Sequence, residues 1–119
     1  MNEFTATFAR LRGLLEPFEE RLVVKHDRAD VYYLDTRHLE QWKKELFFGG
    51  VQIRKTYVAY YLFPVYVFPE LLDDVSPELK RRMQGKSCFN FRSIDDALLG
   101  ELKRLTERGF DRYRKEGFV

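Results

Sequence analysis

Aromatic residues that could bind a ligand gather in a few short stretches of this sequence. Phenol groups combine an apolar ring with a hydrogen-bonding tip. Six of the tyrosines lie in or beside expected strands: Tyr32, Tyr33, Tyr57, Tyr60, Tyr61 and Tyr66. On an open sheet face they could form an amphipathic pocket or groove. The competing interpretation is that aromatic pairs across neighbouring strands only stabilise the sheet.

Five side chains form the predicted ligand-binding site. Tyr33 and Tyr61 would pack on the ligand or hydrogen-bond it. Arg54 and Arg92 would pair with an anionic group, and Asn90 would set its orientation. The basic segment 86–92 would form one edge of the site, although exposed cations are more commonly a solvated surface.

Histidines and carboxylates between residues 26 and 40 offer ligands suited to iron, zinc or manganese. They are His26, Asp27, Asp30, Asp35, His38 and Glu40. None of the recognised tight ligand spacings occurs among them, and the polarity of turns and loops explains their presence. We therefore predict no metal ligand.

Catalytic motifs are incomplete in this sequence. Gly85-Lys86-Ser87 matches the end of a phosphate-binding loop, but Lys80 stands where the motif needs glycine and a strand follows where it needs a helix. Cys88 has basic neighbours but no identifiable base, so a half-buried structural cysteine is the simpler interpretation. No catalytic residue and no cofactor is predicted, which favours a protein that is not an enzyme.

Length and composition predict a single domain over residues 1–119, because domains cluster near ~100 to 150 residues. With 45% hydrophobic and 16% aromatic residues, the chain has apolar surface to bury. Twenty-one Lys and Arg against nineteen Asp and Glu leave a net charge of +2. This balance disfavours nucleic acid as a partner.

Cysteine usage and hydropathy predict a cytoplasmic protein without a membrane segment. Cys88 is the single cysteine, so no intrachain disulfide can form, which fits a reducing compartment. No signal peptide is apparent at the amino terminus. The richest apolar stretch, 57–68, is broken by Pro64 and is shorter than the ~20 residues that span a bilayer.

Apolar periodicity predicts the elements in the first third of the chain. Large apolar residues recur at intervals of four, three, four and three residues, which places Phe4, Phe8, Leu11, Leu15 and Phe18 on one stripe of a helix. Pro17 predicts that this helix ends or kinks at Glu16-Pro17. Segments 22–26 and 31–34 predict a hairpin, and 35–44 a loop or one exposed helical turn that Trp42 holds in place.

The middle of the chain predicts two paired strands. Segment 46–55 is expected to be one strand with a glycine bulge at Gly49-Gly50 rather than a tight hairpin. Segment 57–63 is apolar or aromatic in both alternating sets, which predicts a central strand covered on both faces.

The last third predicts two helices and a short strand. Ser76 as N-cap and proline after it predict a helix over 77–84. Alternation predicts an amphipathic strand over 88–92, and a capping box that begins at Ser93 predicts a helix over 94–115. The whole order predicts an α+β two-layer sandwich, with a mostly antiparallel sheet of about five strands and three helices on one face.

Several blocks of the sequence resemble the YdhG-like family of small bacterial domains of unknown function. These are Val58 to Tyr66, Pro69-Glu70-Leu71-Leu72 and Ser76 to Phe91. The similarity covers nearly the whole chain, and its most specific part is the block from Gly85 to Phe91. The resemblance implies a compact α+β fold, a bacterial cytoplasmic location and no established catalysis. One relative is described as a frataxin-like iron chaperone, which implies iron handling as an alternative.

Three functions are therefore expected in order. The first is a binding module for a small anionic ligand or a protein partner on the tyrosine-rich sheet face. The second is an iron chaperone that uses His26, His38 and nearby carboxylates. The third is an interaction module whose aromatic face forms a homodimer.

Overall fold

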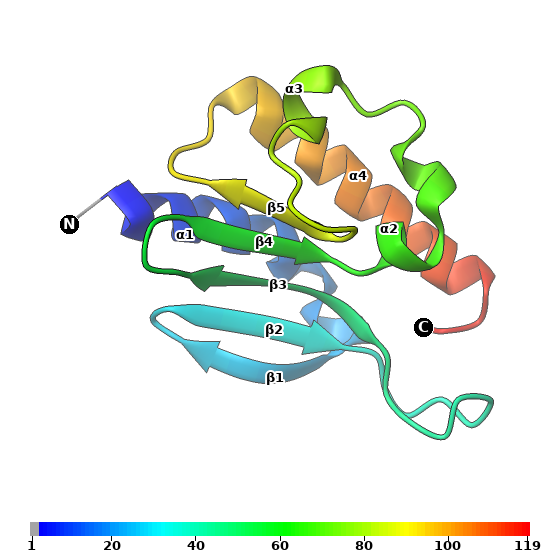
Figure 1. Cartoon of the computed structure of the whole chain (residues 1–119). Helices are drawn as coiled ribbons and strands as arrows, with labels where there is room; N and C mark the ends of the chain where they lie inside the picture. Colours follow the sequence, from blue (N-terminus) through cyan, green and yellow to red (C-terminus); the bar gives the residue numbers. More distant parts are fainter. Residues whose placement is uncertain (1–2) are drawn as a thin grey trace.

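The computed structural model describes residues 3–119. Five strands form one sheet in the order β1-β2-β3-β4-β5, and every neighbouring pair is antiparallel. The strands are β1 Val23–Arg28, β2 Val31–Asp35, β3 Phe47–Ile53, β4 Val58–Leu62 and β5 Cys88–Phe91. The helices α1, Glu3–Leu15, and α4, Asp96–Lys115, lie behind the sheet in Figure 1. This confirms the predicted α+β class.

Four shorter helical turns complete the chain: η1 Glu16–Arg21, α2 Pro64–Val67, η2 Pro69–Leu72 and α3 Pro77–Lys80. The sequence analysis predicts no helix at α2 or η2. In both turns proline occupies the beginning of the helix, where its missing N–H costs nothing and its fixed φ fits.

The helix expected over 77–84 is a single turn, so that prediction was wrong in length. Ser76 caps it as expected, because its hydroxyl accepts from the Leu79 amide at 3.2 Å. Beyond Lys80, backbone groups of Arg82 and Gln84 form hydrogen bonds with β5. The Asn90 amide donates to the Arg82 carbonyl at 2.8 Å, and the Gln84 amide to the Cys88 carbonyl at 3.0 Å. The turn contacts α4, and its Leu79 belongs to the same hydrophobic core as α1 and α4.

The capping box predicted at Ser93 was also misplaced. α4 begins at Asp96, and Asp95 is its N-cap, with a side-chain oxygen that accepts from the Leu98 amide at 2.8 Å. The carboxylate also suits the positive end of the helix dipole. The predicted end at Lys115 is confirmed.

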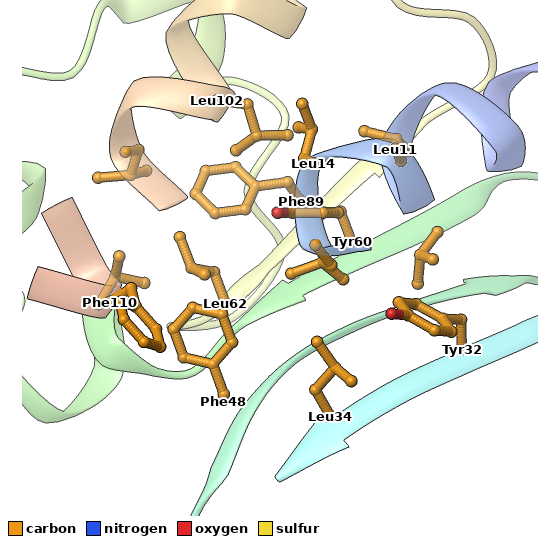
Figure 2. Packing of buried hydrophobic residues seen from close by; sticks show 14 of the residues in the cluster. Leu11, Leu14, Tyr32, Leu34, Phe48, Tyr60, Leu62, Phe89, Leu102 and Phe110 are labelled. Carbon is orange, nitrogen blue, oxygen red and sulfur yellow. The ribbon is translucent and has the colours of Figure 1, made fainter. Parts of the chain in front are cut away.

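The hydrophobic core lies between the sheet and the two long helices (Figure 2). Tyr32, Val51, Tyr60 and Phe89 form a row across β2 to β5 in which every side chain is fully buried. α1 contributes Leu11 and Leu14 to the same core, and α4 contributes Leu102 and Phe110. Each such side chain contributes ~1.5 to 3 kcal/mol through burial, so this layer supplies most of the fold's stability.

Polar atoms inside the core are satisfied. The Tyr60 and Thr106 hydroxyls lie 2.7 Å apart, and Thr106 also donates to the Leu102 carbonyl at 2.8 Å. The Tyr113 hydroxyl donates to the Phe47 carbonyl at 2.7 Å. Within residues 3–119, no buried side-chain nitrogen or oxygen lacks a hydrogen-bond partner.

Within segment 46–55, β3 is one bulged strand rather than a hairpin, as predicted, but the bulge is at Phe48 and not at Gly49-Gly50, which pair regularly with both neighbouring strands. Leu34 pairs with Gly49 and Asp35 with Phe47, so Phe48 is the extra residue. A Cβ atom at Gly49 would lie 3.1 Å from a Leu15 methyl and 3.0 Å from the Tyr61 carbonyl oxygen. Glycine there lets α1 approach the sheet closely.

The prediction that 57–63 is a central strand covered on both faces is borne out in part, because β4 is an interior strand paired with β3 and β5 but both long helices lie on one of its faces. β3 is central, and β4 is the next strand toward β5. Val58, Tyr60 and Leu62 are buried toward the helices, whereas Tyr61 on the other face is half-buried.

No helix of residues 3–119 is long and apolar enough to cross a membrane.

Candidate functional site

The candidate site lies on the sheet face opposite α1 and α4, which faces the viewer in Figure 1. Strand register places two rows of side chains on it. The first row is His26, Tyr33, Gly50, Tyr61 and Cys88, and the second is Arg28, Val31, Gln52, Ala59 and Asn90. Residues two apart on a strand share a face, so three predicted site residues, Tyr33, Tyr61 and Asn90, belong to one surface.

Aromatic rings form a connected cluster on this open face. Tyr33 lies 5.5 Å from Phe47 and 5.9 Å from Tyr61, measured between ring centroids. Phe63 continues the cluster at 6.0 Å from Phe47, and Tyr66 lies 5.1 Å beyond it. Most of these contacts are tilted or edge-to-face, the arrangements that aromatic pairs prefer. Sequence analysis identified the tyrosines but not Phe47 and Phe63.

Gly50 determines where the Tyr33 ring lies. A Cβ atom at Gly50 would stand 2.3 Å from Tyr33 Cδ1, so the ring crosses the space that any other residue would fill. The Tyr33 hydroxyl donates to Gln52 Oε1 at 2.8 Å. Burial, with a smaller contribution from the neighbouring Tyr61 hydroxyl, raises the pKa of Tyr33 to about 12. Tyr33 is therefore neutral and fixed at physiological pH.

Arg54 and Tyr61 form the polar centre of the face. Arg54 Nη2 donates to the Tyr61 hydroxyl oxygen at 2.9 Å, and this hydrogen bond raises the pKa of Arg54 further. Because Tyr61 accepts here, its own O–H remains able to donate. Arg54 forms no ion pair with any carboxylate of residues 3–119. The guanidinium retains donors for an incoming carboxylate or phosphate.

Asn90 and Cys88 form a small network at the β5 edge. The Cys88 thiol donates to Asn90 Oδ1 at 3.1 Å, and Asn90 Nδ2 donates to Gln84 Oε1 at 2.7 Å. Burial raises the pKa of the Cys88 thiol, and the nearby Arg54 opposes that shift only in part. Cys88 is therefore a protonated thiol at neutral pH and a poor nucleophile.

The predicted basic edge 86–92 is divided by the strand between its cations. Lys86 precedes β5, and its Nζ lies 6.0 Å from the centroid of the Tyr66 ring. Arg92 follows β5 at the opposite end, exposed, beside the row Ile53, Val58 and Phe91. A strand rises ~3.3 Å per residue, so the two cations are ~20 Å apart along the chain. Arg92 shares an end of the sheet with Arg54, whereas Lys86 does not.

A hollow of about 530 Å³ adjoins the open face where Phe63 ends the aromatic cluster. Trp42 and Tyr66 line it and are 47% and 49% exposed, which makes them the most exposed large hydrophobic residues of the described chain. Lys44 and Lys86 line it as well. From the sequence, Trp42 is predicted only to hold its loop in place. Residues 42, 66 and 86 share no motif and come together only in the folded chain.

A second hollow of about 600 Å³ lies between α3 and α4, away from the open face. Its lining mixes the cations Arg81 and Arg82 with the carboxylates Glu78, Asp95 and Glu101. Glu101 accepts from both the amide and the hydroxyl of Ser76, at 2.7 and 2.6 Å. These contacts attach the start of α3 to α4, so they serve the fold.

Residues proposed as metal ligands are dispersed by the structure. Asp27 points to the helical side and pairs with Arg12 at 2.7 Å, whereas His26 is on the open face. His38 lies 3.5 Å from Glu45 and 3.7 Å from Glu40. Among residues 3–119, no three histidine, cysteine, aspartate or glutamate side chains form a group that could hold a metal ion.

Comparison with protein-family models, curated proteins and solved structures finds no match to this chain. Membership of the YdhG-like family stays a prediction from the sequence blocks.

Proposed function

We propose that this protein is a non-enzymatic binding module whose open sheet face receives a small organic anion. The observation that carries this proposal is the Arg54 guanidinium, held on the Tyr61 hydroxyl at 2.9 Å and without a carboxylate partner among the described residues. An exposed arginine that is hydrogen-bonded to a phenol oxygen and still has free donors is suited to a carboxylate or phosphate group. The half-buried rings of Tyr33, Phe47 and Tyr61 then accept the apolar part of the ligand.

Roles within the site differ from those first predicted. Arg54 and Tyr61 contact the anionic group, and Tyr33 supplies ring surface because its hydroxyl is engaged by Gln52. Asn90 orients the ligand, and hydrogen bonds with Cys88 and Gln84 hold the Asn90 side chain in place. Arg92 shares the Arg54 end of the sheet and adds a second positive charge.

Thermal-shift screening tests the proposal. A panel of small carboxylates and phosphates is added to the purified protein, because a ligand that binds only the folded state raises the melting temperature. For any anion that stabilises the protein, Arg54→Met should weaken binding by about tenfold through loss of a charge-assisted hydrogen bond. Lys55→Met, next to it in the β3–β4 turn, removes the same charge and should leave the affinity unchanged.

Two outcomes would contradict the proposal. One is the absence of a shift with every organic anion at 10 mM, and the other is equal binding by the Arg54→Met and wild-type proteins. A shift with ferrous iron alone would favour the iron-chaperone alternative, which has no three-ligand group among residues 3–119 to support it. A sedimentation profile that is dimeric, and that Tyr61→Glu makes monomeric, would favour the homodimer.

We place this module in the bacterial cytoplasm. The single cysteine supports that location, because it excludes an intrachain disulfide.

A further inference from the structure

The hollow beside Phe63 is separate from Arg54 and Tyr61, neither of which lines it. Its volume of about 530 Å³ falls within the roughly 300 to 1,000 Å³ of small-molecule sites. It is built by three segments far apart in the sequence: the loop around Trp42, the turn α2 with Tyr66, and the turn before β5 with Lys86.

The two exposed rings are held in place. Trp42 makes an edge-to-face contact with Phe118, at 6.0 Å between ring centroids. Tyr66 lies 5.1 Å from Phe63, tilted by 35°. Fixing each ring by a neighbour lowers the entropy that binding would cost. The exposed ring surfaces are then ready to contact a planar group.

Lys44 and Lys86 give the hollow its charge. Neither lysine forms an ion pair with a carboxylate of residues 3–119, and no carboxylate lines the hollow. The adjacent Lys43, by contrast, pairs with Glu40 at 3.8 Å. A cavity that combines aromatic walls with two unpaired cations is complementary to a planar ligand that carries negative charge.

We infer that this hollow binds a planar aromatic anion, with Trp42 and Tyr66 contacting its ring system and Lys44 and Lys86 contacting its carboxylate or phosphate. The inference does not depend on the proposed function, because the two sites share none of these side chains. Phe63 connects them only as part of the wall.

Trp42 is the single tryptophan of the chain, so its fluorescence reports directly on this site. The probes are AMP, as an aromatic phosphate, and naphthoate, as an aromatic carboxylate. Adenosine is the uncharged control, and inorganic phosphate is the control without a ring. We expect a saturable change in Trp42 fluorescence with AMP, naphthoate or both, and binding to adenosine and to phosphate that is at least threefold weaker.

Variants test the lysines. Lys44→Met and Lys86→Met should each weaken binding of the anionic probe by about threefold, as expected for partly screened charge pairs, and the double variant by about tenfold. Adenosine binding should not change in these variants. Lys55→Met and Arg54→Met are the matched controls and should leave the fluorescence titration as in the wild type.

The inference is overturned by any of three results: no saturable change with either anionic probe at 10 mM, affinity for adenosine equal to that for the anionic probe that binds, or no weakening in the lysine double variant. Because Arg54→Met affects only the sheet-face site, failure at one site is distinguishable from failure at the other.

Discussion

Replacing Gly50 with alanine tests the geometry of the open face most directly. The new methyl group would stand 2.3 Å from Tyr33 Cδ1 and 3.0 Å from the Tyr32 carbonyl oxygen. Ordinary contact begins at 3.4 Å, so the Tyr33 ring must retreat by 3.4 − 2.3, or about 1.1 Å. The ring cannot retreat without disturbing its contacts with Tyr61 and Gln52.

The expected cost follows from these contacts. Overpacking costs ~1 to 3 kcal/mol. Weakening one aromatic pair costs ~0.5 to 1.5 kcal/mol. Against this, alanine lowers the backbone entropy of the unfolded chain, which stabilises the folded protein by ~0.4 to 1 kcal/mol. We therefore expect Gly50→Ala to lower the free energy of unfolding by about 2 kcal/mol, measured by urea denaturation followed by circular dichroism.

A double-mutant cycle locates the clash. In a Tyr33→Ala background the obstructing ring is gone, so adding Gly50→Ala should change the free energy of unfolding by less than about 0.5 kcal/mol. Gly13→Ala is the control, because no atom lies within 4 Å of its Cβ position on α1. It should stabilise the protein by about 0.5 to 1 kcal/mol. Equal destabilisation by Gly50→Ala in both backgrounds would refute the assignment of the clash to Tyr33.

Three further predictions concern the core and the titration of the face. Gly109→Ala places a methyl 3.1 Å from Pro64 Cβ, and we expect urea denaturation to show a loss of about 1 kcal/mol, whereas a stabilised variant would contradict this contact. Tyr60→Phe removes the 2.7 Å hydrogen bond to Thr106, so calorimetry should show a loss of about 1 kcal/mol, and an unchanged melting temperature would count against it. The pKa of Tyr33 rises from 10.0 to about 12 on folding, so the unfolded chain loses this proton first and stability falls as the pH rises from 10 to 12. That fall should be shallower in Tyr33→Phe, and parallel pH profiles for the two proteins would refute the shift.

Most of the fold follows from apolar periodicity. The apolar stripes from Phe4 to Phe18 and from Ile94 to Leu105 predict α1 and α4, because large apolar residues at helical spacing give each helix one face to bury. Alternation in 88–92 likewise predicts β5. The predictions failed where tertiary contacts compete with local signals, as at 81–84, where the Arg82 carbonyl and the Gln84 amide bond to β5 and the helix ends.

The candidate site was predictable in part. Tyr33 and Tyr61 share a face because each belongs to an alternating strand, but their meeting over Gly50 depends on the pairing of β2, β3 and β4. The pairing of β3 with β4 was predicted from the sequence, whereas nothing local indicates the pairing of β2 with β3. The hollow with Trp42, Tyr66 and Lys86 was not predicted, since it requires the positions of a loop, a turn and a strand end relative to one another.

Net charge also conceals how the charges are distributed. A total of +2 disfavours nucleic acid as a partner, yet that sum does not say which groups neutralise one another. On the open side, Glu45 lies within ion-pair distance of Lys25 and His38, and burial raises the pKa of Asp35. Arg54, Lys44 and Lys86 keep no such partner within residues 3–119. A nearly neutral chain therefore presents local positive charge beside aromatic surface. Salt should weaken anion binding at both sites, because the cations concerned are largely exposed. At 0.1 M salt the interaction between exposed charges is screened over a Debye length of ~10 Å.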